Sequence, residues 1–190
     1  MDSPDISAMV VQAYGQLKDG RFEDAIDAFS ACLRLEPAQV DAYRGRAVAY
    51  FQLKQWPRAA ADFAQAKALD AGEAEHWIGL AMSLAMDHKI YEAIEVFETF
   101  LAKHPQHVRA HIQLAQLYYR LGVIAKGHAQ LDLALAARPS LGERRTIEQM
   151  QHEQLALDKR RYYRPDFEAL RRNTAPLFAG VFRRLKAFFT

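Results

Sequence analysis

A period of 34 residues runs through the first three-quarters of the chain and limits its fold more than any other feature. Similar residues recur at fixed places in four successive cycles, with no insertion between them. The columns are Ala13, Ala47, Ala81 and Ala115; Ala25, Ala59, Ala93 and Gly127; Phe29, Phe63, Phe97 and Leu131; and Pro37, Ala71, Pro105 and Pro139. Self-similarity at such a period indicates stacked structural repeats, in which neighbouring units bury a shared core.

Each cycle has the pattern of two helices, and the third cycle shows this most clearly. Its first half spaces apolar residues at i, i+3, i+4 and i+7, and its second half places a similar run after a short polar turn at 87–89. The two runs are Trp77, Leu80, Ala81 and Leu84, then Ala93, Ile94, Phe97, Phe100 and Leu101. Pro105 ends the second helix, because it has no amide hydrogen to donate.

These motifs resemble the tetratricopeptide repeat (TPR) family. The third cycle carries Trp77-x2-Leu80-x3-Leu84, then Ala93-x3-Phe97 and Pro105, and the second carries Tyr43, Ala47, Tyr50, Ala59 and Phe63. The resemblance covers about residues 6–141 and implies an all-α, right-handed solenoid of four helix-turn-helix repeats, at 6–39, 40–73, 74–107 and 108–141. Departures from the pattern include Met9 and His111 in place of Trp or Tyr, Gln16 in place of an aromatic, Ala71 in place of Pro, and Gly127.

The resemblance also implies that a partner binds on the face lined by the first helix of each repeat. Helical spacing selects residues on the side opposite the packing side: Val10, Tyr14, Arg44, Val48, Phe51, Ile78, Met82, Met86, Arg109, Ile112, Gln116 and Tyr119. The set mixes aromatic residues, Met and Arg, which are enriched where proteins bind one another. We therefore predict a protein or peptide partner. The alternative is that these residues pack against neighbouring repeats or against the chain's own tail.

One subgroup of the family clamps a C-terminal carboxylate with Lys, Asn and Arg. Asn173 is the only asparagine in this chain, and it lies outside the repeats. Val10, Tyr14, Gly45 and Gly79 stand where that clamp needs polar groups. The sequence therefore argues against a carboxylate clamp and predicts a hydrophobic or mixed groove.

Two further segments follow the repeats. Residues 142–163 are expected to form a capping helix with a solvated outer face. Residues 164–190 are expected to form a short helix and then a basic amphipathic helix, which carries Leu177, Phe178, Val181, Phe182, Arg183, Arg184, Leu185, Lys186, Phe188 and Phe189. This last helix suits packing on the array, lying on an anionic membrane surface, or docking into a partner. Amphipathicity alone does not choose among these three.

Charge is spread unevenly along the chain. The net charge is +2, with −3 over residues 1–141 and +5 over residues 142–190, so the two parts are expected to differ in their partners. An acidic array argues against nucleic acid. A single cysteine, no signal-like N-terminus and no long apolar run predict a cytoplasmic protein, with membrane association through the tail as the open alternative.

No motif for chemistry emerges from the sequence. Gly-rich phosphate loops, nucleophile elbows and HExxH helices are lacking. His107 and His111 have helical i, i+4 spacing beside His104, but no third ligand is evident, so we predict neither metal nor cofactor. The predicted function is a non-enzymatic adaptor or scaffold. The alternatives are a membrane-peripheral assembly factor anchored by the tail, and a chaperone-like TPR protein for exported substrates.

Overall fold

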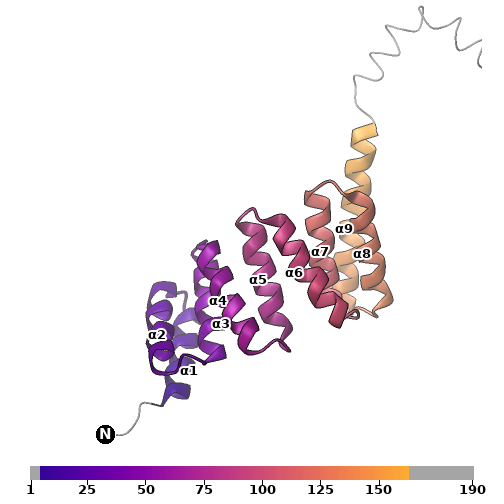
Figure 1. Cartoon of the computed structure of the whole chain (residues 1–190). Coiled ribbons are helices and arrows are strands. Elements are labelled where there is room, and N and C mark those ends of the chain that lie inside the picture. The colour runs from indigo at the N-terminus through magenta and orange to yellow at the C-terminus, as the bar shows by residue number, and fades with distance from the viewer. Residues whose placement is uncertain (1–4, 163–190) are drawn as a thin grey trace, which may run out of the picture. The chain divides into compact units, whose positions relative to one another are not determined.

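The computed structural model describes residues 5–162, and within that range every regular element is an α-helix. Residues 1–4 and 163–190 lie outside the described part. The helices are α1 (Ile6–Lys18), α2 (Phe22–Leu35), α3 (Val40–Gln52), α4 (Trp56–Leu69), α5 (Ala74–Met86), α6 (Ile90–Lys103), α7 (Val108–Arg120), α8 (Ile124–Ala136) and α9 (Leu141–Tyr162). The first eight form four successive antiparallel hairpins (Figure 1). The predicted all-α repeat array is thereby confirmed.

The 34-residue period of the sequence is reproduced by the helices themselves. First helices begin at Ile6, Val40, Ala74 and Val108, and second helices begin at Phe22, Trp56, Ile90 and Ile124. The turn inside each hairpin places one residue in the left-handed region: Gly20, Lys54, His88 and Gly122, with φ between 59° and 77°. In the second hairpin the Gln55 amide donates to the Tyr50 carbonyl oxygen at 2.8 Å, which closes the helix end in the Schellman manner.

The hairpins are joined by phenylalanine rings that lie on glycine. Phe29 of α2 is fully buried and covers Gly45 of α3, so that a Cβ added to Gly45 would overlap its ring. Phe63 of α4 covers Gly79 of α5 in the same way, 34 residues later. Because glycine has no side chain, α3 can approach α2 closely, and α5 can approach α4 closely. The glycines thus set the spacing between repeats.

The third junction lacks this glycine. Gln113 of α7 stands where Gly45 and Gly79 stand in the preceding cycles. The backbones of α6 and α7 accordingly run close together over a shorter stretch than those of α2 and α3 or of α4 and α5. The fourth hairpin is therefore held less closely than the other three.

A polar network reinforces the first junction. The guanidinium of Arg46 on α3 donates two hydrogen bonds to the carboxylate of Asp62 on α4, at 2.7 and 2.8 Å, and a third to Ser30 Oγ on α2 at 3.0 Å. The rings of Tyr43 and Tyr50 flank the guanidinium, with centroids 5.7 and 6.0 Å away. Two parallel bonds in this fork geometry fix Arg46 in place. The repeat pattern did not reveal the network, although Arg46 and Asp62 stand where the next cycle has Leu80 and Val96.

Helix α9 begins with a capping box. The Ser140 amide donates to Glu143 Oε2 at 2.8 Å, and the Glu143 amide donates to Ser140 Oγ at 3.3 Å. The hydrogen bonds from Ser140 lower the pKa of Glu143. One compact unit runs as far as Glu143, and a second begins at Arg144. The capping role of residues 142–163 stays a prediction. The expected short helix and the amphipathic helix at 177–189 lie outside the described residues.

In the range from residue 5 to 162, no helix has both the length and the apolar character needed to cross a membrane.

The glycine contacts predict opposite effects for the same substitution at two sites. Gly45→Ala should destabilise the protein by about 1–3 kcal/mol, because the new methyl group meets a fully buried ring. Gly15→Ala, in α1, meets nothing within 4 Å and should stabilise by about 0.5–1 kcal/mol through helix propensity. Urea unfolding followed by circular dichroism measures both. An unfolding midpoint for Gly45→Ala at or above that of the wild type would contradict the junction described above.

Two ion pairs, Arg46–Asp62 between α3 and α4 and Glu75–Arg109 between α5 and α7, predict a second contrast. Asp62→Ala should cost about 3 kcal/mol, the lower end of the range for a broken buried pair, because Asp62 is 8% exposed and Arg46 is 20% exposed. Glu75→Ala breaks the Glu75–Arg109 pair, whose side chains are both more than half exposed, and should cost less than about 1 kcal/mol. Thermal unfolding of both variants checks the difference, and similar losses would show that the buried network contributes little.

Candidate functional site

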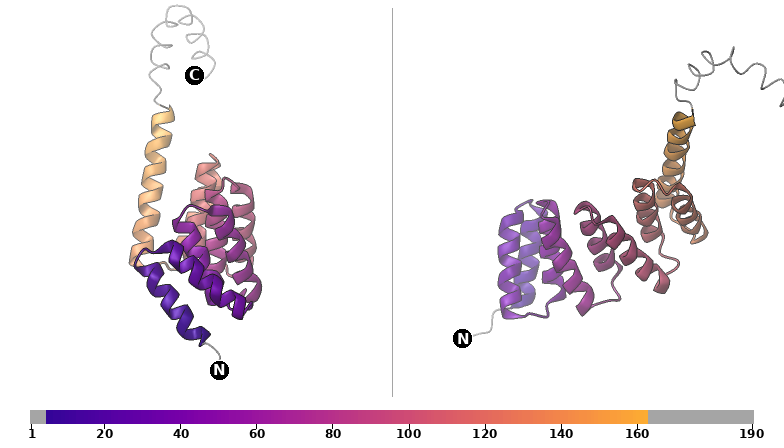
Figure 2. Two further views of the ribbon diagram at one scale, coloured as in Figure 1. Left: turned by 90° about the vertical axis from the view of Figure 1, so that its left-hand side faces the viewer. Right: turned by 45° about the horizontal axis from the view of Figure 1, so that its top comes forward.

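The candidate site is the face formed by the first helices of the repeats. Within the described array, α1 contacts α3 and α3 contacts α5, whereas no two second helices make a comparable contact. In the first three hairpins the first helices therefore lie closer together than the second helices do, which makes their side the inner, concave side of that part of the array. The further views in Figure 2 show the same succession of hairpins.

Tyr14 and Arg44 form a polar bridge between α1 and α3 on this face. The Tyr14 hydroxyl donates to the backbone oxygen of Asp41 at 2.9 Å and accepts from Arg44 Nε at 3.1 Å. Arg44 Nη2 donates to Asp41 Oδ1 at 2.7 Å. Burial raises the pKa of Tyr14, so its hydroxyl stays protonated as a donor. Both predicted residues thus take part in joining two repeats, and the charge of Arg44 is balanced by Asp41.

An apolar strip lies beside this bridge on α3 and α5. Val48 and Met82 occupy equivalent positions of two cycles and are half-buried, and Met86, one turn beyond Met82, is 39% exposed. Gln116 is the equivalent residue of α7 and is exposed. We call Val48, Met82 and Met86 the apolar strip. It offers accessible hydrophobic surface on the inner face, and methionine adapts its shape readily to a contacting group.

Three predicted residues lie beneath the surface instead of on it. Val10, Ile78 and Ile112 are only 7%, 8% and 5% exposed. These three residues and Arg44 occupy equivalent positions of the four cycles, and of the four only Arg44 has a polar group, which reaches the solvent. Their side chains complete the core below the face, so they support its shape and offer no area for a partner.

Two predicted aromatic residues pack within their own hairpins. The Phe51 ring meets Trp56, the first residue of α4, edge-to-face with centroids 4.8 Å apart. Tyr119 lies over Gly127 of α8, where a Cβ would overlap its ring, and its hydroxyl is 3.1 Å from His128 Nδ1. Gly127 replaces the alanine of earlier cycles at the place where this larger ring needs room. The two rings remain half-buried and border the face from the side of the turns.

Charged groups border the face at α5 and α7. Arg109 Nη1 lies 2.9 Å from Glu75 Oε1, and this pair links equivalent positions of the third and fourth cycles. Arg120 Nη2 donates to the Ala85 carbonyl oxygen at 3.3 Å. The inner face is therefore apolar at its middle, and its ion pairs balance each other's charge.

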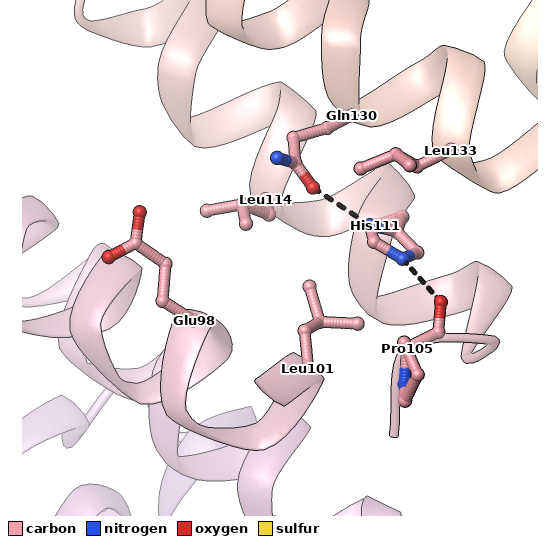
Figure 3. Close-up of a pocket in the computed structure, with 7 residues that line it drawn as sticks. All are labelled: Glu98, Leu101, Pro105, His111, Leu114, Gln130 and Leu133. Atoms are coloured by element: carbon pink, nitrogen blue, oxygen red, sulfur yellow. Dashed lines mark hydrogen bonds between the residues drawn. The ribbon is translucent and has the colours of Figure 1, made fainter. Parts of the chain in front are cut away.

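The second helices face a cavity that sequence reasoning missed. It has a volume of about 280 Å³ and lies between α6 and the fourth hairpin (Figure 3). Its walls combine aliphatic and polar side chains: Glu98, Leu101, Pro105, His111, Leu114, Gln130 and Leu133. The available signal was His111, which the sequence pattern marks as a departure from the usual Trp or Tyr.

Histidines near this cavity have structural partners. His107 Nδ1 accepts from the Ala110 amide at 3.2 Å and caps α7, and burial lowers the pKa of His107. The His104 ring stacks on Phe100 with centroids 4.6 Å apart. His111 Nε2 is 3.0 Å from the Pro105 oxygen, and its Nδ1 is 2.7 Å from Gln130 Oε1. Among residues 5–162, no group of three or more His, Cys, Asp or Glu side chains is arranged to hold a metal ion.

Known proteins share this architecture. Human (Homo sapiens) RNA polymerase II-associated protein 3 is 24% identical over 155 residues, which are 80% of this chain and 23% of that protein, so the chain spans less than a quarter of the relative's length. The crystal structure of MamA superimposes with a TM-score of 0.65 at 20% identity, covering 70% of this chain and 78% of that chain. The first TPR of Spaghetti (RPAP3), bound to the HSP90 peptide SRMEEVD, gives 0.58 at 24% identity, covering 64% and 97%.

Two family models match the array directly. Each is described as tetratricopeptide repeat; one covers residues 10–74 and the other residues 84–143. Together they cover most of the four hairpins, and the stretch between the two matches, residues 75–83, includes Gly79 and Met82. The chain belongs to the tetratricopeptide repeat family, whose domains serve as protein–protein interaction modules.

Proposed function

We propose that this protein is a non-enzymatic adaptor that holds a segment of a partner protein against the face of its first helices. The observation that carries the proposal is the apolar strip of Val48, Met82 and Met86, which is exposed in part on the concave side. Apolar side chains with Met at the centre of a concave surface are typical of the groups that dominate binding energy.

The electrostatics of the face favour a partner that inserts apolar side chains. Arg44 is engaged by Asp41 and Tyr14, and Arg109 is engaged by Glu75, so neither cation is offered alone to a carboxylate. These pairs would border the bound segment as a polar rim around the strip. An amphipathic helix or an extended segment with hydrophobic anchors suits such a surface.

The partner chemistry proposed here differs from that of the peptides bound in two similar structures. Two structures of RPAP3 TPR domains contain the HSP90 peptide SRMEEVD and the HSP70 peptide SGPTIEEVD. Both peptides end in the sequence Glu-Glu-Val-Asp. The present array lacks asparagine, and Val10, Gly45 and Gly79 occupy places where a carboxylate clamp needs polar groups. We therefore propose hydrophobic anchoring in place of carboxylate capture, which also fits a chaperone-like role toward exposed apolar segments.

A membrane-peripheral role rests on the tail, where Phe178, Phe182 and Phe189 share a face and Arg183 and Lys186 lie opposite in the sequence pattern. Phe182→Asp/Phe189→Asp should abolish flotation of the full chain with phosphatidylserine vesicles if that face anchors it. Arg172→Ala, which lies before the expected amphipathic helix in the sequence, serves as the control. This alternative would be contradicted if the wild type and both variants float equally well, or if the wild type does not float.

The strip predicts which substitutions release the partner. Val48→Asp/Met82→Asp should lower recovery of a crosslinked partner from native extract by at least about tenfold, because losing a central hot spot costs about 2 kcal/mol or more. Tyr91→Asp is the matched control, since Tyr91 is 77% exposed on α6 and lies away from the inner face. Circular dichroism verifies that each variant keeps its helices.

Two outcomes would contradict the proposal. Partner recovery that is equal for the double variant and the wild type would remove the strip from the binding surface. Binding of SRMEEVD that is as tight for the double variant as for the wild type, with loss on Arg44→Ala, would assign carboxylate capture in its place.

A further inference from the structure

The cavity at the third junction lies outside the proposed partner-binding face. It opens between the second helices α6 and α8, where Glu98 is exposed and Leu133 is 49% exposed, so it can be reached from solvent (Figure 3). Leu101, Leu114 and Leu133 provide apolar walls, and Pro105 closes one end. Binding at this cavity can therefore be tested independently of binding at the apolar strip.

The internal repeat shows what fills the equivalent space one cycle earlier. His111 occupies the place of Trp77 in the 34-residue period. Trp77 Nε1 donates to the Ala71 oxygen at 2.9 Å, and His111 Nε2 lies 3.0 Å from the Pro105 oxygen, the residue equivalent to Ala71. The ring is held by the same backbone position in both cycles. Imidazole is smaller than indole, so the space that an indole fills in the third cycle is left open in the fourth.

Other cavity residues also have counterparts in the third cycle. Leu114 corresponds to Leu80, Gln130 to Val96 and Leu101 to Lys67. In the third cycle Lys67 Nζ lies 4.6 Å from the centroid of the Trp77 ring, and Phe100 lies 5.7 Å from it. The cavity therefore corresponds to the place of an aromatic ring, with leucine in place of Lys67, glutamine in place of Val96 and alanine in place of Phe100.

Size restricts the occupant to about one large side chain. An engineered cavity of about 150 Å³ takes up benzene, and pockets for drug-sized ligands begin at about 300 Å³. A volume of about 280 Å³ lies between these and has room for a two-ring system. A single aliphatic side chain would leave much of it unfilled.

Charge restricts the occupant further. Glu98 is the one charged residue among the seven that line the cavity, and Glu95, three residues earlier on the same helix, is exposed. Glu98 Oε1 accepts from the Tyr118 hydroxyl at 2.6 Å, and burial together with this hydrogen bond raises the pKa of Tyr118 to about 12. An acidic rim attracts a hydrogen-bond donor or a cation and repels an anion.

We propose that the cavity between α6, α7 and α8 is a second binding site, which takes the indole side chain of a tryptophan from a partner protein. The ring lies between Leu101, Leu114 and Leu133, in the place that Trp77 holds one cycle earlier. The indole N–H supplies the donor that the acidic rim at Glu98 favours. The partner thus supplies to the fourth repeat the large aromatic ring that this repeat lacks.

N-acetyltryptophanamide tests this site on the full chain by methyl NMR. We expect saturable shifts at the methyl groups of Leu101, Leu114 and Leu133, and binding of the anion indole-3-acetate about tenfold weaker because of the acidic rim. His111→Trp should fill the cavity, abolish the shifts and raise the melting temperature. Tyr91→Trp, which adds the same side chain at a position that is 77% exposed, should leave binding unchanged.

Glu98→Gln provides a second variant that does not depend on refilling the core. It should bring the affinity for indole-3-acetate up to that for the neutral amide. The proposal is overturned if no saturable shifts occur at the three leucines, if His111→Trp binds as well as the wild type, or if the wild type binds the anion as tightly as the amide.

Discussion

The packing of a phenylalanine ring on a glycine, repeated from one hairpin to the next, is the contact on which the array depends. Phe29 on Gly45 brings α3 close to α2, and Phe63 on Gly79 brings α5 close to α4. No larger residue fits at either glycine without moving a buried ring. Close approach at these junctions also brings neighbouring first helices into contact, which creates the concave face. The proposed binding surface is thus a consequence of the core.

The three junctions between hairpins share one backbone arrangement but contain different side chains. The first contains the Arg46–Asp62–Ser30 network, the second contains Trp77 beside Lys67, and the third contains His111 and a cavity. Solenoid stability is approximately a sum of repeat and interface terms, so a change at one junction is not compensated elsewhere. A loosened third junction is therefore a local property, and it gives the fourth hairpin a feature that a partner can use.

Periodicity determined the repeat positions well, because core columns of Ala and Phe must recur wherever equivalent helices pack. Periodicity was less successful in predicting which residues are exposed on the inner face. Val10, Ile78 and Ile112 share a column with Arg44, and helical spacing does not distinguish a position at the surface from one just beneath it. Phe51 and Tyr119 turn toward their own second helices, which depends on partners such as Trp56 and Gly127. The cavity arises from the size of His111 relative to its neighbours, which no single-residue pattern expresses.

Native-state hydrogen exchange tests the central claim, that ring-on-glycine junctions hold the repeats together. The first and fourth hairpins differ in this contact, because α1–α2 is joined to the array through Phe29 on Gly45 and α7–α8 joins it where Gln113 replaces glycine. We predict that the amides of α7 and α8 exchange through an opening of lower free energy than those of α1 and α2. Equal protection of both hairpins, or weaker protection of α1 and α2, would contradict the claim.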